Sequence, residues 1–212
     1  MTYTKLTGTA TSLAANTDDI IDGVAVTVDE SGAASTYATV DQINTLTTRV
    51  AAVSNASLSY EKLNDSATNL AAGDTSYLAG IAITIDDTNN AAATATELNT
   101  IQTKMGQSGS VSYTKLRDSA SVLVTNIADI VAGVAVTIID TGVNTPATVS
   151  ELNSLQSAVS SAGNGASLTY TKLRDTSANI RANVDENNAI TDVAGIAVTV
   201  TTASNVSEYS SI

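Results

Sequence analysis

Aspartates recur in the sequence at two places where their carboxylates could bind a divalent cation. One set follows a recurring apolar segment and comprises Asp29, Asp86, Asp87 and Asp140, with Glu30 beside Asp29. A second set follows another recurring segment and comprises Asp65, Asp118 and Asp175. Calcium binds several oxygen ligands at once, so rows of carboxylates predict a calcium site at Asp29, Asp86, Asp87 and Asp140. The structural alternative is that these aspartates form Asx turns and cap helices, which the following Ser and Thr residues favour.

Two further rows of side chains could contact a ligand. The lysine row could bind a glycan or an acidic partner, and it comprises Lys5, Lys62, Lys115 and Lys172. The tyrosine row could stack on sugar rings, and it comprises Tyr3, Tyr60, Tyr113 and Tyr170. The alternatives are that the lysines pair with neighbouring aspartates and that the tyrosines pack between repeats. We expect these structural roles, with register between repeats as their main effect.

The sequence contains no Cys and no His. It therefore has no disulfide, no thiolate or imidazole metal ligand, no Cys nucleophile and no Ser-His-Asp triad. We expect no enzymatic activity and no required cofactor. One remote alternative is a polysaccharide-acting solenoid enzyme. That enzyme would need acidic residues that interrupt the repeats, and the only such pair is Asp185 and Glu186, close in sequence to Arg181.

The chain is acidic, with a net charge of −12 and a pI near 4.1 over 212 residues. This charge argues against nucleic-acid binding, which needs clustered Lys and Arg, and against anionic membrane surfaces. No apolar run is long enough to span a membrane. The N-terminal sequence MTYTKLTGTATS lacks the features of a secretory signal peptide, so we expect another route out of the cell, or packaging in a particle.

Internal repetition is the strongest signal in the sequence. SYTKLRD at 112–118 returns as TYTKLRD at 169–175, SYEKLND at 59–65 and TYTKLTG at 2–8. A second signature follows each, namely GVAVTV, GIAITI, GVAVTI and GIAVTV. A third follows three of them, namely TVDQINTL, TATELNTI and TVSELNSL. These matches define four tandem repeats of about 55 residues, at 1–57, 58–110, 111–167 and 168–212, the last one truncated.

Each repeat is predicted to contain a strand, a short helix, a second strand and a longer helix. Val24, Val26 and Val28 alternate along the second strand and should share one face. In the first strand, Leu58 and Tyr60 should share a face, and Leu63 then breaks the alternation. The short helix should be anchored by one apolar residue in each repeat: Leu70, Leu123 and Ile180 in the last three.

The longer helices carry one apolar stripe each. The stripes comprise Val40, Ile43, Leu46 and Val50; Ala95, Leu98, Ile101 and Met105; and Val149, Leu152, Leu155 and Val159. Each helix should begin with a capping box, at Thr39 with Gln42, Thr94 with Glu97, and Thr148 with Glu151.

Strand–helix–strand connections of this length favour parallel strands. The prediction is therefore an α/β protein. It should form a parallel-sheet solenoid of four β-α-β-α repeats, or eight half-units like leucine-rich repeats, in one elongated domain over 1–212. A closed or doubly wound α/β domain is the rival fold, but it does not explain the fourfold identity.

The two ends of the repeat array should expose apolar edges. Neither shows the polar cap that solenoids use to remain soluble. The expected assembly edges comprise Tyr3, Leu6, Val206, Tyr209 and Ile212. End-to-end or lateral association would follow, and a head-to-tail contact that does not close makes a filament. A five-residue insertion, Asp185 to Ala189, should bulge from the surface of the fourth repeat.

The succession of YTKLRDSASVL, GVAVTIID and ATVSELNSL resembles the Ala/Thr/Ser-rich tandem repeats of very large surface proteins in marine cyanobacteria and other bacteria, and of virion proteins of their phages. The resemblance implies a structural or adhesive role outside the cell. We therefore expect a structural protein that self-assembles into a filament or lattice, or decorates a particle such as a phage virion. The expected partners are copies of itself or other structural proteins, with a glycan as a further option. The alternative is a secreted calcium-dependent adhesin or surface-layer module.

Overall fold

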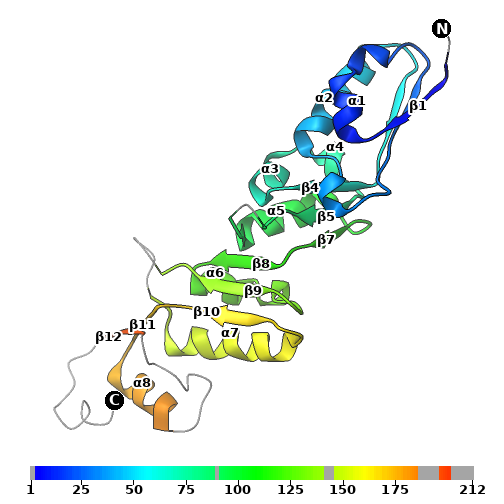
Figure 1. Ribbon diagram of the computed structural model, residues 1–212. Coiled ribbons are helices and arrows are strands. Elements are labelled where there is room, and N and C mark those ends of the chain that lie inside the picture. Colours follow the sequence, from blue (N-terminus) through cyan, green and yellow to red (C-terminus); the bar gives the residue numbers. More distant parts are fainter. Residues whose placement is uncertain (1–2, 89–90, 141–145, 186–195, 202–212) are drawn as a thin grey trace. The chain divides into compact units, whose positions relative to one another are not determined.

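The computed structural model describes residues 3–88, 91–140, 146–185 and 196–201. The chain divides into two compact units, Met1–Tyr113 and Thr114–Ile212, which we call unit 1 and unit 2. Both units combine helices with parallel strands, which confirms the predicted α/β class with parallel sheets (Figure 1). Each unit contains two of the predicted repeats, and their arrangement in one elongated domain stays a prediction.

Unit 1 alternates strands and helices along the chain. Its strands are β1 (Lys5–Gly8), β2 (Ala25–Val28), β3 (Ser57–Ser59), β4 (Lys62–Asp65), β5 (Ala82–Ile85), β6 (Ala93–Thr94) and β7 (Ser110–Ser112). Its α-helices are α1 (Ala10–Ala15), α2 (Val40–Ala51), α3 (Ala67–Ala72), α4 (Thr75–Leu78) and α5 (Ala95–Met105). Short 3-10 helices lie at Thr17–Asp19 and Ala34–Thr36.

Unit 2 follows the same alternation. Its strands are β8 (Lys115–Asp118), β9 (Ala135–Ile138), β10 (Ser167–Thr169), β11 (Lys172–Asp175) and β12 (Ala197–Val200). Its α-helices are α6 (Ala120–Thr125), α7 (Val149–Ala162) and α8 (Ser177–Asp185). A short 3-10 helix lies at Ile127–Asp129.

The strands pair in parallel in short groups. In unit 1 the orders are β1-β2-β3 and β4-β5-β7. In unit 2, β9 lies between β8 and β10, and β11 pairs with β12. One further parallel bridge in each unit joins the residue before a capping box to the next repeat, Ala38 to Leu63 and Ala147 to Leu173. Neighbouring repeats within a unit are therefore linked by backbone pairing.

The prediction of one continuous first strand is wrong in the second, third and fourth repeats. In the second repeat the segment is divided into β3 and β4, and Tyr60 and Glu61 lie between them. The first part, β3, pairs backward with β2, and the second part, β4, pairs forward with β5. The same division separates β10 from β11. The interrupted alternation at Leu63 indicated this break, because Leu63 belongs to the new pairing register of β4 and is fully buried.

The core consists of small aliphatic side chains, as the repeats predict. Val26 and Val28 of β2 are buried, and so is Val24 immediately before the strand. The short-helix anchors are buried in every repeat, namely Leu13, Leu70, Leu123 and Ile180. The stripes of α5 and α7 are buried throughout, whereas only Ile43 and Leu46 of the α2 stripe are fully buried. Each long helix packs on the short helix that precedes it, as α2 does on α1 and α7 on α6 (Figure 1).

The long helices begin as predicted. All three capping boxes are present, with Thr39, Thr94 and Thr148 accepting from the N3 backbone N–H and receiving the reciprocal N3 side chain. Helices α5 and α7 end at glycines with positive φ, Gly106 and Gly163. Glycine suits these positions because a side chain strains the left-handed backbone. Among the described helices, none has the length and apolar character needed to cross a membrane.

Candidate functional site

The carboxylate at the end of the second strand contacts the break in the following first strand. In unit 1, the Glu30 carboxylate accepts hydrogen bonds from the backbone N–H of Glu61, at 2.9 and 3.0 Å, and of Lys62, at 2.9 Å. In unit 2, the Asp140 carboxylate accepts from the Thr171 N–H, at 2.9 Å, and from its hydroxyl, at 2.8 and 3.0 Å. We call this the strand-break contact. It gives partners to N–H groups that the divided strand leaves out of the sheet.

The aspartate at the end of the first strand makes a second contact in the opposite direction. One carboxylate oxygen of Asp65 accepts from the N–H of Val40, the first residue of α2 in the preceding repeat, at 3.0 Å. Its other oxygen accepts from Ser66 N–H and from the Asn69 side chain, both at 2.8 Å. We call this the helix-start contact, because one carboxylate stabilises the N-termini of two helices in adjacent repeats.

Asp175 repeats this geometry in unit 2. Its carboxylate accepts from the N–H of Val149, the first residue of α7, at 3.0 Å. It also accepts from Thr176 N–H and from the Asn179 side chain, both at 2.7 Å. The structural alternative for this row, helix capping, is therefore observed at both aspartates. The sequence did not predict that each aspartate would also accept a hydrogen bond from a helix of the preceding repeat.

The environment of Asp140 favours its ionised form. Burial raises the pKa of its carboxyl. Hydrogen bonds from the Thr171 N–H, the Thr171 hydroxyl and the Lys172 N–H lower the pKa, as does the nearby positive charge of Lys172, and together they outweigh burial. The net effect holds the pKa of Asp140 below its ordinary value. A lowered folded-state pKa stabilises the protein above the unfolded-state pKa, and that stabilisation disappears as the pH falls through the folded-state pKa.

We therefore expect Asp140→Asn to lower the free energy of unfolding at pH 7 and to have a smaller effect in acid. The difference between wild type and variant should shrink as the pH falls below about 4, because protonation then removes the charge from Asp140 in the wild type. Urea unfolding of both proteins between pH 7 and pH 2 measures this difference. A difference that stays constant over that range would contradict the assigned role.

The lysine row contacts backbone carbonyls next to the acidic row. The Lys62 ammonium donates to the carbonyl O of Glu30 at 3.3 Å, and the Lys172 ammonium donates to the carbonyl O of Asp140 at 2.8 Å. Lys62 also lies 4.9 Å from the centre of the Tyr37 ring, within the range of a cation–π contact. Lys62 and Lys172 thus reinforce the strand-break contact, while Lys5 of the first repeat is exposed.

The tyrosine row is half-buried in all four repeats. The Tyr3 hydroxyl donates to the carbonyl O of Asp19, and the Tyr60 hydroxyl donates to the carbonyl O of Tyr77 at 3.1 Å. Burial, aided by the neighbouring Tyr77 and Glu30, raises the pKa of Tyr60 to about 12. The Tyr60 hydroxyl therefore stays protonated and donates to α4, the helix that follows the short helix α3.

The predicted calcium residues do not all lie in equivalent places. Asp140 corresponds to Glu30 and not to Asp29, because the N–H groups of Asp29 and Ile139 donate to the ends of the paired strands β1 and β8. Asp29 is exposed and accepts from Ser31 N–H, Asp86 accepts from Thr88, and Asp87 is 2% exposed. Within residues 3–88, 91–140, 146–185 and 196–201, no three acidic side chains converge as a metal site. The calcium site stays a prediction.

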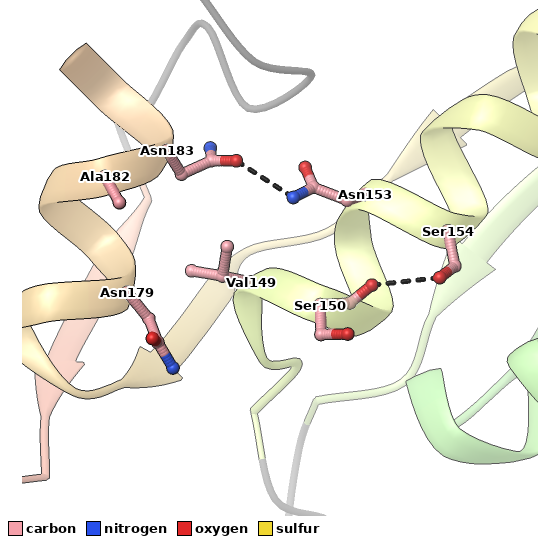
Figure 2. A pocket seen from close by; sticks show the side chains of 7 residues that line it. All are labelled: Val149, Ser150, Asn153, Ser154, Asn179, Ala182 and Asn183. Carbon is pink, nitrogen blue, oxygen red and sulfur yellow. Dashed lines mark hydrogen bonds between the residues drawn. The ribbon is translucent and has the colours of Figure 1, made fainter. Parts of the chain in front are cut away.

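A polar groove between α7 and α8 was not predicted. It encloses about 410 Å³ and is lined by Val149, Ser150, Asn153, Ser154, Asn179, Ala182 and Asn183 (Figure 2). The Asn153 side-chain amide donates to the Asn183 side chain at 2.9 Å across the groove (Figure 2). The sequence does contain one sign of these asparagines, because the motifs TVDQIN, TATELN and TVSELN all end in asparagine.

Unit 1 has a groove at the equivalent place, between α2 and the next repeat. It encloses about 380 Å³ and is lined by Val40, Asp41, Asn44, Asn69, Ala72, Gly73 and Asp74. Here the Tyr77 hydroxyl donates to the Asn44 side chain at 3.0 Å. In both units the asparagine of the long helix therefore bonds to a residue of the following repeat. This pattern makes the asparagine a third link between repeats.

Several predicted positions lie outside the described residues. These are the assembly-edge residues Val206, Tyr209 and Ile212, together with most of the Asp185 to Ala189 insertion. Of the remaining assembly-edge residues, Tyr3 and Leu6 are both half-buried at the β1 edge. Comparison of the chain with protein-family models, with curated proteins and with solved structures finds no match.

Proposed function

We propose that this chain is a non-enzymatic structural protein built from four stacked repeats. The repeats form an α/β solenoid, in which each β-α-β-α unit is held to the next by the strand-break and helix-start contacts. The protein acts by assembling with copies of itself, in a filament or lattice, or by decorating a larger particle such as the outer surface of a phage virion.

The observation that carries this proposal is the recurrence of both contacts. Glu30 and Asp65 join the first repeat to the second, and Asp140 and Asp175 join the third to the fourth. Each pair of contacts runs in opposite directions across one boundary. An interface that is repeated in sequence and geometry is the property of a stacking protein, because each repeat must fit a neighbour of its own kind.

The use made of the reactive side chains also supports a structural role. Both carboxylate oxygens of Asp65, Asp140 and Asp175 accept hydrogen bonds from groups within the protein. Lys62 and Lys172 donate to backbone carbonyls. Groups engaged in this way position backbone and are poorly placed to act on a substrate.

Assembly can be tested on the purified protein by light scattering and electron microscopy, with and without a calcium chelator. We expect particles heavier than the 21.5 kDa chain at high concentration, with the same form after chelation. The physical reason is that the observed contacts between repeats use carboxylates bonded to N–H groups and need no metal. A monodisperse 21.5 kDa species at every concentration would contradict self-assembly. Loss of the folded state on chelation would instead favour the calcium-dependent adhesin.

A further inference from the structure

The side-chain oxygen of Asn153 is a buried acceptor that receives no donor from the described residues. The Asn153 Nδ2 donates to the Asn183 side chain at 2.9 Å, whereas the Asn153 Oδ1 is buried and has no hydrogen-bond partner (Figure 2). Buried polar atoms in folded proteins are nearly always paired, whether with protein groups, water or a bound molecule. Asn153 therefore offers an unused acceptor in the groove between α7 and α8.

Unit 1 shows which kind of donor suits this acceptor. Asn44 is the equivalent of Asn153, because each lies five residues after the capping-box threonine of its long helix, Thr39 or Thr148. The Tyr77 hydroxyl donates to the Asn44 Oδ1 at 3.0 Å. The same acceptor thus receives an O–H group in unit 1. A hydroxyl from a bound molecule would complete the equivalent hydrogen bond in unit 2.

The lining of the groove is neutral and rich in groups that both donate and accept hydrogen bonds. Its polar members are Ser150, Asn153, Ser154, Asn179 and Asn183, and the remaining lining side chains are apolar. Amides and hydroxyls match the hydroxyl groups of a sugar, which also donate and accept. A charged ligand would lose water here without meeting an opposite charge, which is unfavourable. The lining therefore favours an uncharged, hydroxyl-rich ligand.

The size of the groove agrees with a small-molecule site. Its volume of about 410 Å³ lies within the range of about 300–1,000 Å³ that is usual for such sites. The equivalent groove of unit 1 differs in two respects. Asp41 and Asp74 make its lining acidic, and Tyr77 already donates to its central asparagine. We therefore expect the ligand to bind in unit 2.

We propose that the groove between α7 and α8 binds a neutral saccharide, with the Asn153 Oδ1 accepting a hydrogen bond from a sugar hydroxyl. Asn183 is a positioning residue. It is only 4% exposed, and by accepting from the Asn153 Nδ2 it leaves the Asn153 oxygen for the ligand. A peptide N–H could also donate to this oxygen, but the donor observed in unit 1 is a hydroxyl. The site goes beyond the proposed assembly function and does not depend on it.

Saturation-transfer NMR observed on the sugar protons tests the proposal with the full chain, whether it is monomeric or assembled. The probes are cellobiose and N,N′-diacetylchitobiose, with trialanine as the peptide for comparison. We expect a saturable signal from at least one of the two sugars. The proposal is overturned if neither sugar gives a saturable signal at its highest soluble concentration, or if only trialanine does.

Two substitutions locate the binding. Ala182 is exposed and lines the groove, so Ala182→Phe should block it and remove the sugar signal. The matched control is Ala72→Phe, at the equivalent exposed position of the unit 1 groove, and it should leave the signal unchanged. Equal effects of these two variants would overturn the placement in unit 2. Circular dichroism checks that both variants fold.

A third substitution tests the acceptor itself. Asn153→Ala should weaken sugar binding by about tenfold, as expected for the loss of one hydrogen bond. Unchanged affinity in folded Asn153→Ala would overturn the role of Asn153. These outcomes are separate from those for assembly. A monomeric wild type that binds sugar contradicts self-assembly alone, and an assembled wild type that binds no sugar contradicts this inference alone.

Discussion

Replacing Leu63 with alanine is expected to lower the free energy of unfolding by about 3–5 kcal/mol. Leu63 is fully buried in β4. It pairs with Ile83 on one side and bridges to Ala38 of the preceding repeat on the other. Truncation removes apolar area and leaves a cavity between two repeats that are fixed by backbone pairing, so the site can collapse only in part.

Leu58→Ala is the matched control, since it removes the same atoms from the same segment of sequence. Leu58 lies in β3 and is only half-buried, so we expect a loss of about 1 kcal/mol. Urea unfolding monitored by circular dichroism gives both values, with an unchanged m value as evidence that the denatured state is the same. Equal losses at the two positions would contradict the difference in burial between Leu58 and Leu63.

This pair of residues also explains which part of the fold could be predicted. Period-two alternation located β2, and capping boxes located all three long helices, because these signals depend on residues within one element. The division between β3 and β4 depends on Glu30, which accepts from N–H groups of the following repeat. Within residues 59–65, the only local sign of this division is Leu63, which breaks the period-two alternation of the segment.

The candidate site was predictable in composition but not in geometry. The repeated aspartates identified the polar positions, and helix capping by Asp65 and Asp175 follows from their place before Ser and Thr. The second partner of each aspartate, Val40 or Val149, lies in the preceding repeat. Finding it requires the register between strands, which also shows that Asp140 corresponds to Glu30. Sequence similarity alone had grouped Asp140 with Asp29.

Asp65→Ala tests the helix-start contact directly and should lower the free energy of unfolding by about 2–4 kcal/mol. Hydrogen bonds to a charged acceptor contribute about 1.5–3 kcal/mol each, and the three at Asp65 are not additive. Asp29→Ala is the control, because Asp29 is exposed and its observed bond is to Ser31 within its own loop. We expect Asp29→Ala to leave the free energy of unfolding nearly unchanged.

Hydrogen exchange distinguishes a link between repeats from a simple cap on α3. If Asp65 holds the preceding repeat, Asp65→Ala should speed exchange of the Val40 amide as well as the Ser66 amide, although residues 40 and 65 lie in different repeats. Thr39→Ala should speed exchange at the start of α2 alone, since the Thr39 side chain serves only that helix. If exchange in Asp65→Ala is faster only in α3, Asp65 caps that helix alone and does not link the two repeats. Exchange that rises on both sides of the boundary would make one carboxylate the element that joins two repeats.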